Sequence, residues 1–269
     1  MAKLRGERAA FGWPGIEPRW TYADEDGVGT AYAISSRIWF TLLNGVLTEI
    51  YYPTVDRPQV RDLQYLITDG STFFHEERRH LRTSTERIAP QALGYRVTNE
   101  DPDGRYAIVK EIISDPHYPC ILQHTTLDGE SDLLSRLRFH ALCAPHLAGG
   151  GWGNNADVVE VAGRTILTAE KQGTWLALGA DVPFSRASCD YVGRSDGWTD
   201  LADSFQMEWQ FDRATDGNVA LPGELALEGR TMFTLGLALG ESLHNAVTTL
   251  LQSLDLPFTA QRGYRRRAA

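Results

Sequence analysis

The chain has 269 residues with a formal net charge of -9, and its hydrophobic content of 42% and charged content of 23% are ordinary for a globular protein. This length supports one large domain or two small ones with a proper core, and the composition excludes general disorder. The acidic balance argues against a protein that coats nucleic acid or anionic lipid. No run approaches the roughly 18 apolar residues of a transmembrane helix, and the charged start lacks a signal peptide, so we expect a cytoplasmic protein without a membrane partner.

Short alternating runs dominate the chain from about residue 31 to residue 239. They are rich in Val, Ile, Leu, Thr and aromatic residues, and turn residues separate them, for example at 99–104 and 171–173. The clearest runs are residues 94–98, 105–113, 133–142, 165–169 and 175–180. Period-two alternation predicts strands, and the short spacing predicts antiparallel hairpins. The expected fold class is all-β, as a large antiparallel sandwich.

One amphipathic helix is predicted near the end of the chain. Residues 241–251 place Leu243, Ala246, Val247 and Leu250 on one stripe, directly after a glycine. We therefore divide the chain into four parts. These are a flexible N-terminus (1–11), a β-sandwich domain (12–240), a linker helix with its exit (241–258) and a basic tail (259–269).

The sequence Gly-Arg-Ser-Asp-Gly at residues 193–197 matches the nucleophile elbow of serine hydrolases. The elbow requires a strand before the serine and a helix directly after it. Residues 205–211 are strand-like instead, and the surrounding sequence predicts hairpins. Asp212 and His244 would complete the order Ser–Asp–His, but a chain of this size offers that order by chance. We therefore predict that Ser195 is not a nucleophile.

The remaining reactive residues form no recognisable catalytic or metal pattern. Cys120, Cys143 and Cys189 are an odd number without a CxxC, which indicates free thiols. The seven histidines include no HExxH, and the spacing of His140, Cys143 and His146 lacks a further ligand. The glycine run at 149–153 lacks the Lys-Ser/Thr of a phosphate loop, and Glu76–Glu77 falls in a ribbon that we expect to be solvated. No catalytic residue, metal site or cofactor is predicted.

Two tryptophans lie in glycine-rich loops rather than in predicted strands. Trp152 is followed by Asn154, and Trp198 is followed by Asp200. A loop tryptophan beside polar residues is typical of a sugar-binding platform or of a domain interface. The sequence favours the interface.

Several motifs together resemble one known family. They are Pro-Gly-Ile-Glu-Pro-Arg-Trp at 14–20, Asp-Gly-Val-Gly-Thr at 26–30, Ser-Arg-Ile-Trp-Phe-Thr at 36–41, the stretch 45–53 that ends in Tyr-Tyr-Pro, Asp-Leu at 62–63, Thr-Asp-Gly at 68–70, 191–201, and Gly-Asn-Val-Ala-Leu at 217–221. Over residues 12–258 the chain resembles the N-terminal domain of prokaryotic glucoamylases and glucodextranases of glycoside hydrolase family 15. The resemblance implies a super-β-sandwich of the galactose mutarotase-like type with one C-terminal linker-type helix.

The resemblance also implies a catalytic partner. In that family two glutamates hydrolyse the glycosidic bond with inversion, facing each other across an (α/α)6 barrel that follows the sandwich. This chain ends after one predicted helix, so no catalytic glutamate is carried over. The implied partners are the (α/α)6 domain, in cis or in trans, and an α-glucan oligosaccharide. Our candidates for the face toward the sugar cleft or the domain interface are Arg37, Tyr51, Tyr52, Asp56, Trp152, Asn154, Trp198 and Asp200.

Three functions remain open from the sequence. The leading one is a non-catalytic accessory domain of an α-glucan hydrolase, which predicts no turnover by this chain alone. A stand-alone carbohydrate-binding module would instead bind maltodextrin or dextran without a partner. An aldose epimerase-like enzyme requires a paired histidine and carboxylate, and the sequence shows no such pair. No Asp/Asn loop matches a calcium-ligand spacing.

Overall fold

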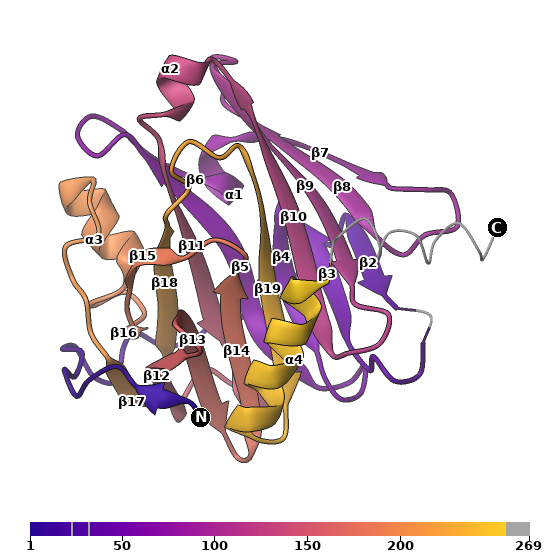
Figure 1. The fold of residues 1–269 in the computed structure, drawn as a ribbon, viewed down its shortest axis with the longest axis vertical. Helices are drawn as coiled ribbons and strands as arrows, with labels where there is room; N and C mark the ends of the chain where they lie inside the picture. The colour runs from indigo at the N-terminus through magenta and orange to yellow at the C-terminus, as the bar shows by residue number, and fades with distance from the viewer. Residues whose placement is uncertain (23, 32, 257–269) are drawn as a thin grey trace.

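The computed structural model describes residues 1–22, 24–31 and 33–256, which form two antiparallel sheets packed face to face (Figure 1). The fold is all-β, as the alternating sequence predicted. The predicted basic tail at 259–269 lies outside the described residues. Among the described residues, no helix combines the length and the apolarity needed to cross a bilayer.

The ten-stranded sheet, here called sheet A, has the order β1-β12-β13-β14-β19-β10-β9-β8-β7, and β17 also pairs with β12. Its strands are β1 (Lys3–Leu4), β7 (Arg82–Arg87), β8 (Tyr95–Glu100), β9 (Tyr106–Ser114), β10 (Cys120–Gly129), β12 (Asn154–Val161), β13 (Arg164–Lys171), β14 (Thr174–Ala180), β17 (Arg213–Gly217) and β19 (Met232–Gly240).

The nine-stranded sheet, here called sheet B, has the order β15-β18-β11-β5-β4-β3-β2, with β16 on β18 and β6 on β5. Its strands are β2 (Gly27–Thr30), β3 (Trp39–Leu43), β4 (Val46–Tyr51), β5 (Pro58–Thr68), β6 (Phe74–Glu76), β11 (Arg138–Pro145), β15 (Phe184–Ala187), β16 (Asp190–Tyr191) and β18 (Val219–Leu225). The helical segments are α1 (Glu77–His80), α2 (Ser131–Leu134), η1 (Leu147–Gly149), α3 (Gly197–Ser204) and α4 (Leu243–Asp255).

The main core lies between the two sheets. Strand β8 shows why the alternation produces it, because Tyr95, Val97 and Asn99 are buried while Arg96 and Thr98 between them are more exposed. The largest rings of this core include Phe40, Tyr65 and Phe233, with Tyr65 and Phe233 packed edge to face at 5.7 Å between ring centroids. Removal of this apolar core from water is the main favourable term in the stability of the sandwich.

Helix α4 covers the outer face of sheet A, in front of β10, β14 and β19 in Figure 1. Ser242 caps its first turn by accepting a hydrogen bond from Asn245 N at 3.1 Å. The predicted stripe is buried, with Ala246 and Leu250 packed in a second apolar cluster with Ala177 and Ala238. The predicted helix near the end of the chain is therefore confirmed.

The structure differs from the sequence interpretation at the N-terminus. Residues 1–11 were expected to be flexible, but β1 pairs with β12 and Ala9 bridges to Arg213. Arg5 Nε also donates to Asp212 Oδ1 at 2.6 Å. These partners are at least 155 residues away along the chain, so no local pattern predicts the pairing.

Two predicted strands are also wrong in part. The run at 133–142 begins as a strand only at Arg138, because α2 occupies residues 131–134. Residues 205–211 form no strand, and the short helix α3 precedes them, where the sequence was interpreted as having no long helix. Asp196 explains the helix, since its side chain accepts a hydrogen bond from Thr199 N at the first turn.

The close approach of β2 to the core gives a stability prediction. A Cβ atom at Gly29 would overlap the ring of Phe40, which is fully buried. We expect Gly29→Ala to lower the free energy of unfolding by about 1–3 kcal/mol because the site is overpacked. Urea unfolding measures this loss. In the Phe40→Leu background the added methyl has room, so equal losses in both backgrounds would contradict the packing argument.

Candidate functional site

One end of sheet B gathers most of the predicted site residues around Gln59, which the sequence interpretation missed. Gln59 is 2% exposed, and its Nε2 donates to Tyr52 O at 2.6 Å. Its Oε1 accepts from Ala148 N at 2.8 Å, and its main-chain oxygen accepts from His146 N at 3.0 Å. Gln59 thus joins the β4–β5 loop to the loop between β11 and β12. A glutamine inside a strand carries no sequence signal for such a role.

Arg37 and Tyr52 line a groove of about 500 Å³ beside α4. The Arg37 guanidinium lies 5.9 Å from the centroid of the Tyr52 ring. Burial raises the pKa of Tyr52, Arg37 opposes this shift, and Glu241 adds to it. The groove is completed by Ser35, His117, Tyr118, Pro119, Ser242, Asn245, Thr248, Thr249 and Gln252. The opposite charges of Arg37 and Glu241, together with the hydroxyl and amide groups, suit a neutral polar ligand.

Tyr51 and Asp56 lie on either side of the turn into β5. The Tyr51 hydroxyl donates to the Glu49 carboxylate, and burial together with Glu49 raises the pKa of Tyr51. Asp56 is exposed and accepts from Thr54 Oγ1 at 2.5 Å, which lowers its pKa. Tyr51 faces outward from sheet B, whereas the next residue, Tyr52, belongs to the core.

The loop before β12 exposes Trp152, whereas Asn154, the first residue of β12, is buried. Asn154 Nδ2 donates to Gly151 O at 2.8 Å and to Gly150 O at 3.0 Å, while its Oδ1 accepts from Leu147 N at 3.0 Å. These bonds hold the loop and leave Asn154 unavailable to a ligand. Trp152 is 44% exposed and remains accessible.

Trp198 lies on α3, which packs on the outer face of sheet B. Its Nε1 donates to Glu76 Oε2 at 2.9 Å, and Arg79 lies 5.8 Å from its ring. Glu76 and Glu77 are buried, so the prediction of a solvated ribbon is wrong. Asp200 is also buried and accepts from Trp209 N at 2.7 Å.

The hydrogen bond of Trp198 gives a second prediction. Trp198→Phe removes a donor from the buried Glu76 carboxylate, and we expect a loss of about 1–2 kcal/mol in the free energy of unfolding. Chemical denaturation measures it. Trp13→Phe is the matched control, since the exposed Trp13 indole donates to Asp216 O at 2.9 Å and its loss is expected to be smaller. Equal losses would contradict the role assigned to burial.

The sequence Gly-Arg-Ser-Asp-Gly at residues 193–197, which matches the nucleophile elbow, has a structural role. Ser195 is fully buried, and its Oγ accepts from Tyr191 N at 3.1 Å. Asp212 is held by Arg5, and His244 lies on α4 against the other sheet. The short helix after Ser195 fits the elbow better than the sequence suggested, but the serine hydroxyl is engaged by a main-chain N–H, and Asp212 is engaged by Arg5.

The three cysteines and the histidines His140 and His146 are buried. Cys120, Cys143 and Cys189 are free and buried, and burial raises the pKa of each thiol. Burial lowers the pKa of His140 and of His146 to about 4. Across residues 1–22, 24–31 and 33–256, no three His, Cys, Asp or Glu side chains gather in a group that could hold a metal ion.

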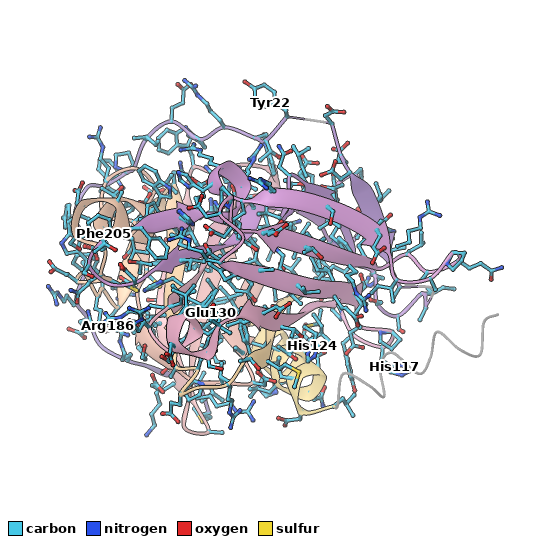
Figure 2. The ribbon with its side chains drawn as sticks, turned by 90° about the horizontal axis from the view of Figure 1, so that it is seen from above. Tyr22, His117, His124, Glu130, Arg186 and Phe205 are labelled. Carbon is cyan, nitrogen blue, oxygen red and sulfur yellow. The ribbon has the colours of Figure 1, made fainter. Side chains whose placement is uncertain are left out.

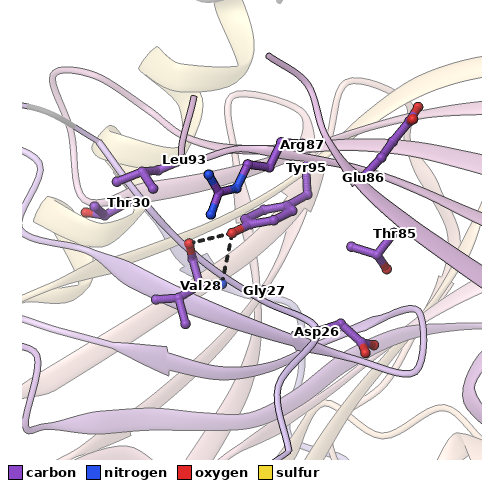
Figure 3. Close-up of a pocket in the computed structure, with 9 residues that line it drawn as sticks. All are labelled: Asp26, Gly27, Val28, Thr30, Thr85, Glu86, Arg87, Leu93 and Tyr95. Atoms are coloured by element: carbon purple, nitrogen blue, oxygen red, sulfur yellow. Dashed lines mark hydrogen bonds between the residues drawn. The ribbon is translucent and has the colours of Figure 1, made fainter. Parts of the chain in front are cut away.

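A second cavity of about 470 Å³ opens between the sheet edges formed by β2 and by β7 and β8 (Figure 3). Tyr95 lines it, and the Tyr95 hydroxyl both donates to Val28 O at 2.9 Å and accepts from Val28 N at 3.1 Å. Both bonds join β8 of sheet A to β2 of sheet B at this edge of the sandwich. None of the predicted site residues lines this cavity.

The predicted site residues therefore fall into two groups. Arg37, Tyr51, Tyr52, Asp56, Trp152 and Asn154 lie around Gln59, whereas Trp198 and Asp200 lie on α3. Tyr52, Asn154 and Asp200 are buried, and the others keep exposed surface. Whether a candidate residue is buried or exposed depends on the direction in which its side chain points.

Known proteins match nearly the whole chain. The family described as glucodextranase, domain N, matches residues 10–266. A glucoamylase of Clostridium sp. (strain G0005) is 30% identical over 247 residues, covering 92% of this chain but 35% of the relative. A bacterial glucoamylase solved in complex with acarbose superposes with a TM-score of 0.93 at 28% identity, covering 98% of this chain and 39% of that chain.

A family GH92 inverting mannosidase from Bacteroides thetaiotaomicron shares the fold alone, with a TM-score of 0.52 at 10% identity over 88% of this chain and 32% of the mannosidase. The chain thus spans well under half of the length of its relatives. The sequence motifs, the sandwich and these matches agree: the chain belongs to the glucodextranase domain N family and corresponds to the N-terminal domain of glucoamylases.

Proposed function

We propose that the chain is the non-catalytic N-terminal accessory domain of an α-glucan hydrolase, and that it packs on an (α/α)6 catalytic domain and shapes its sugar cleft. The observation that carries the proposal is the coverage. The chain is matched over 92% of its length by a glucoamylase of which it covers only 35%. The larger part of that relative lies beyond the matched domain.

The end of sheet B around Gln59 suits this task. Its loops are tied together by hydrogen bonds to buried groups, so Trp152, Arg37 and Asp56 project from a fixed base. An aromatic face stacks on the C–H surface of a pyranose, and carboxylate or guanidinium groups bind its hydroxyls. Groups held rigidly lose little conformational entropy when a sugar or a second domain contacts them.

A carbohydrate-binding module is the second candidate, and the groove beside α4 favours it. The groove combines Tyr118, Asn245 and Gln252 with the opposite charges of Arg37 and Glu241. Such a surface matches an uncharged oligosaccharide better than an ion. Its volume falls in the range of small-molecule sites.

Activity and binding assays on the chain alone separate these functions. We expect no hydrolysis of p-nitrophenyl-α-glucoside or maltose, and no heat of binding in a calorimetric titration with maltoheptaose. Heat without hydrolysis would instead favour the binding module. Hydrolysis that survives repurification would overturn the accessory role.

A further inference from the structure

An exposed apolar segment crosses one end of sheet B. This segment, here called the strap, comprises residues 11–22, and its exposed large side chains are Phe11, Trp13, Ile16, Trp20 and Tyr22. They are between 37% and 86% exposed. Large apolar side chains gathered on a surface mark an interaction site rather than ordinary surface composition.

Hydrogen bonds fix the strap to the connecting residues that follow β16 and precede β18. Ile16 N donates to Val192 O at 3.0 Å, and Ile16 O accepts from Asn218 Nδ2 at 2.9 Å. Further along, the Trp20 ring meets the edge of the His146 ring at 4.7 Å between centroids. The strap thus presents its aromatic side chains in a fixed arrangement, which lowers the entropy lost on association.

The strap continues into other exposed groups on the same side. Pro18 packs directly on Gly151, so Trp152 stands beside the strap. Tyr51 and Arg61 project half-buried from β4 and β5 of sheet B. Figure 2 shows Tyr22 on the side of the molecule opposite α4. Helix α4 covers the outer face of sheet A, whereas among the described residues α3 and the strap lie on the outer side of sheet B.

The polar part of this face centres on Arg61. Arg61 Nε pairs with Asp62 Oδ2 at 2.9 Å, while Asp196 and Glu76 also lie near Arg61 and help to raise its pKa. Asp62 Oδ1 is buried without a hydrogen-bond partner. These carboxylates are buried and hold the half-buried Arg61 side chain in place on this face. Aromatic residues and arginine are the residues enriched at protein interfaces.

We infer that the strap, together with the outer face of sheet B around Trp152 and Arg61, is the docking site of the catalytic domain. The inference rests on the proposed function, because the occupant is the remaining part of the hydrolase. That part has sufficient size, since this chain covers only 35% and 39% of the two glucoamylases. Contact areas between domains are typically about 600–1,500 Å², which exceeds the strap alone and requires the adjoining sheet face.

A domain exchange tests the inference. The matched N-terminal region of the Clostridium glucoamylase is replaced by this chain, and thermal inactivation of maltose hydrolysis is followed. The double variant Tyr22→Glu, Trp152→Glu is expected to shorten the half-life about tenfold, because two charges enter an apolar contact. Met232→Glu is the matched control, since Met232 is 59% exposed at the start of β19 in sheet A. We expect this control to keep the half-life of the unsubstituted exchange enzyme.

The outcomes separate the inference from the proposed function. A double variant that matches the Met232→Glu control overturns the docking site and leaves the accessory role standing. An unsubstituted exchange enzyme that is no more stable than the glucoamylase without any N-terminal domain overturns both. Melting of the isolated chain verifies that the double variant folds, since both side chains are exposed and equal melting temperatures are expected.

Discussion

Replacing Glu77 by Gln is expected to lower the free energy of unfolding by about 3–5 kcal/mol, because it leaves the Lys110 ammonium buried without its counter-ion. Both side chains are fully buried between the sheets, with 2.7 Å between Lys110 Nζ and Glu77 Oε1. Glu77 Oε2 also accepts from Tyr65 N at 2.7 Å, and Lys110 donates to Gly45 O at 2.6 Å. The charged atoms of Glu77 and Lys110 thus have partners within the fold. Because both side chains are buried, water cannot take the place of a partner that is lost.

Urea unfolding of Glu77→Gln and of Lys110→Met measures the loss. Arg164→Ala is the matched control, because Arg164 and Asp255 form an exposed pair at 3.1 Å whose loss is expected to cost less than about 1 kcal/mol. The double variant Glu77→Gln, Lys110→Met should regain part of the stability, since it removes both charges. A loss no larger than that of the control would contradict the role of the buried pair.

Acidification from pH 6.5 to pH 4 is expected to destabilise the fold through His140 and His146. Burial lowers the pKa of each to about 4, so the unfolded chain binds protons that the folded chain does not. Stability is therefore complete above pH 6.5 and is lost as the pH falls toward 4. A shift of this size corresponds to roughly 3 kcal/mol for each histidine. Asp190 and Asp200 have raised pKa values and act in the opposite direction at the acid end of this range.

Unfolding at pH 7 and at pH 4.5 isolates the histidine contribution. The variant His146→Gln keeps a polar side chain that does not titrate, and we expect its loss of stability on acidification to be smaller than that of the unsubstituted chain. His244→Gln is the control, because His244 is exposed on α4. An identical pH dependence in the unsubstituted chain and in His146→Gln would exclude the mechanism.

The sequence alone determined the fold class and the family. Alternation with period two is a local property, and strands such as β8 and β14 follow it within one or two residues. The stripe of α4 is local as well. The cap of α3 is local too, because the Asp196 side chain accepts from Thr199 N three residues later. The strand-like residues 205–211 obscured this signal in the sequence.

Only the tertiary structure decided which candidate residues remain available to a partner. Tyr51 and Tyr52 are adjacent and chemically alike, yet one faces outward from sheet B and the other enters the core. Trp152 and Asn154 are close neighbours in the chain, but the Asn154 amide is engaged by the main chain of the loop that contains Trp152. The role of Gln59 and the burial of Glu77 depend on segments that meet only after folding, because hydrogen-bond partners and desolvation are set by neighbours in space. The sequence therefore specified the sandwich and its family, and the packing of the two sheets selected the surface.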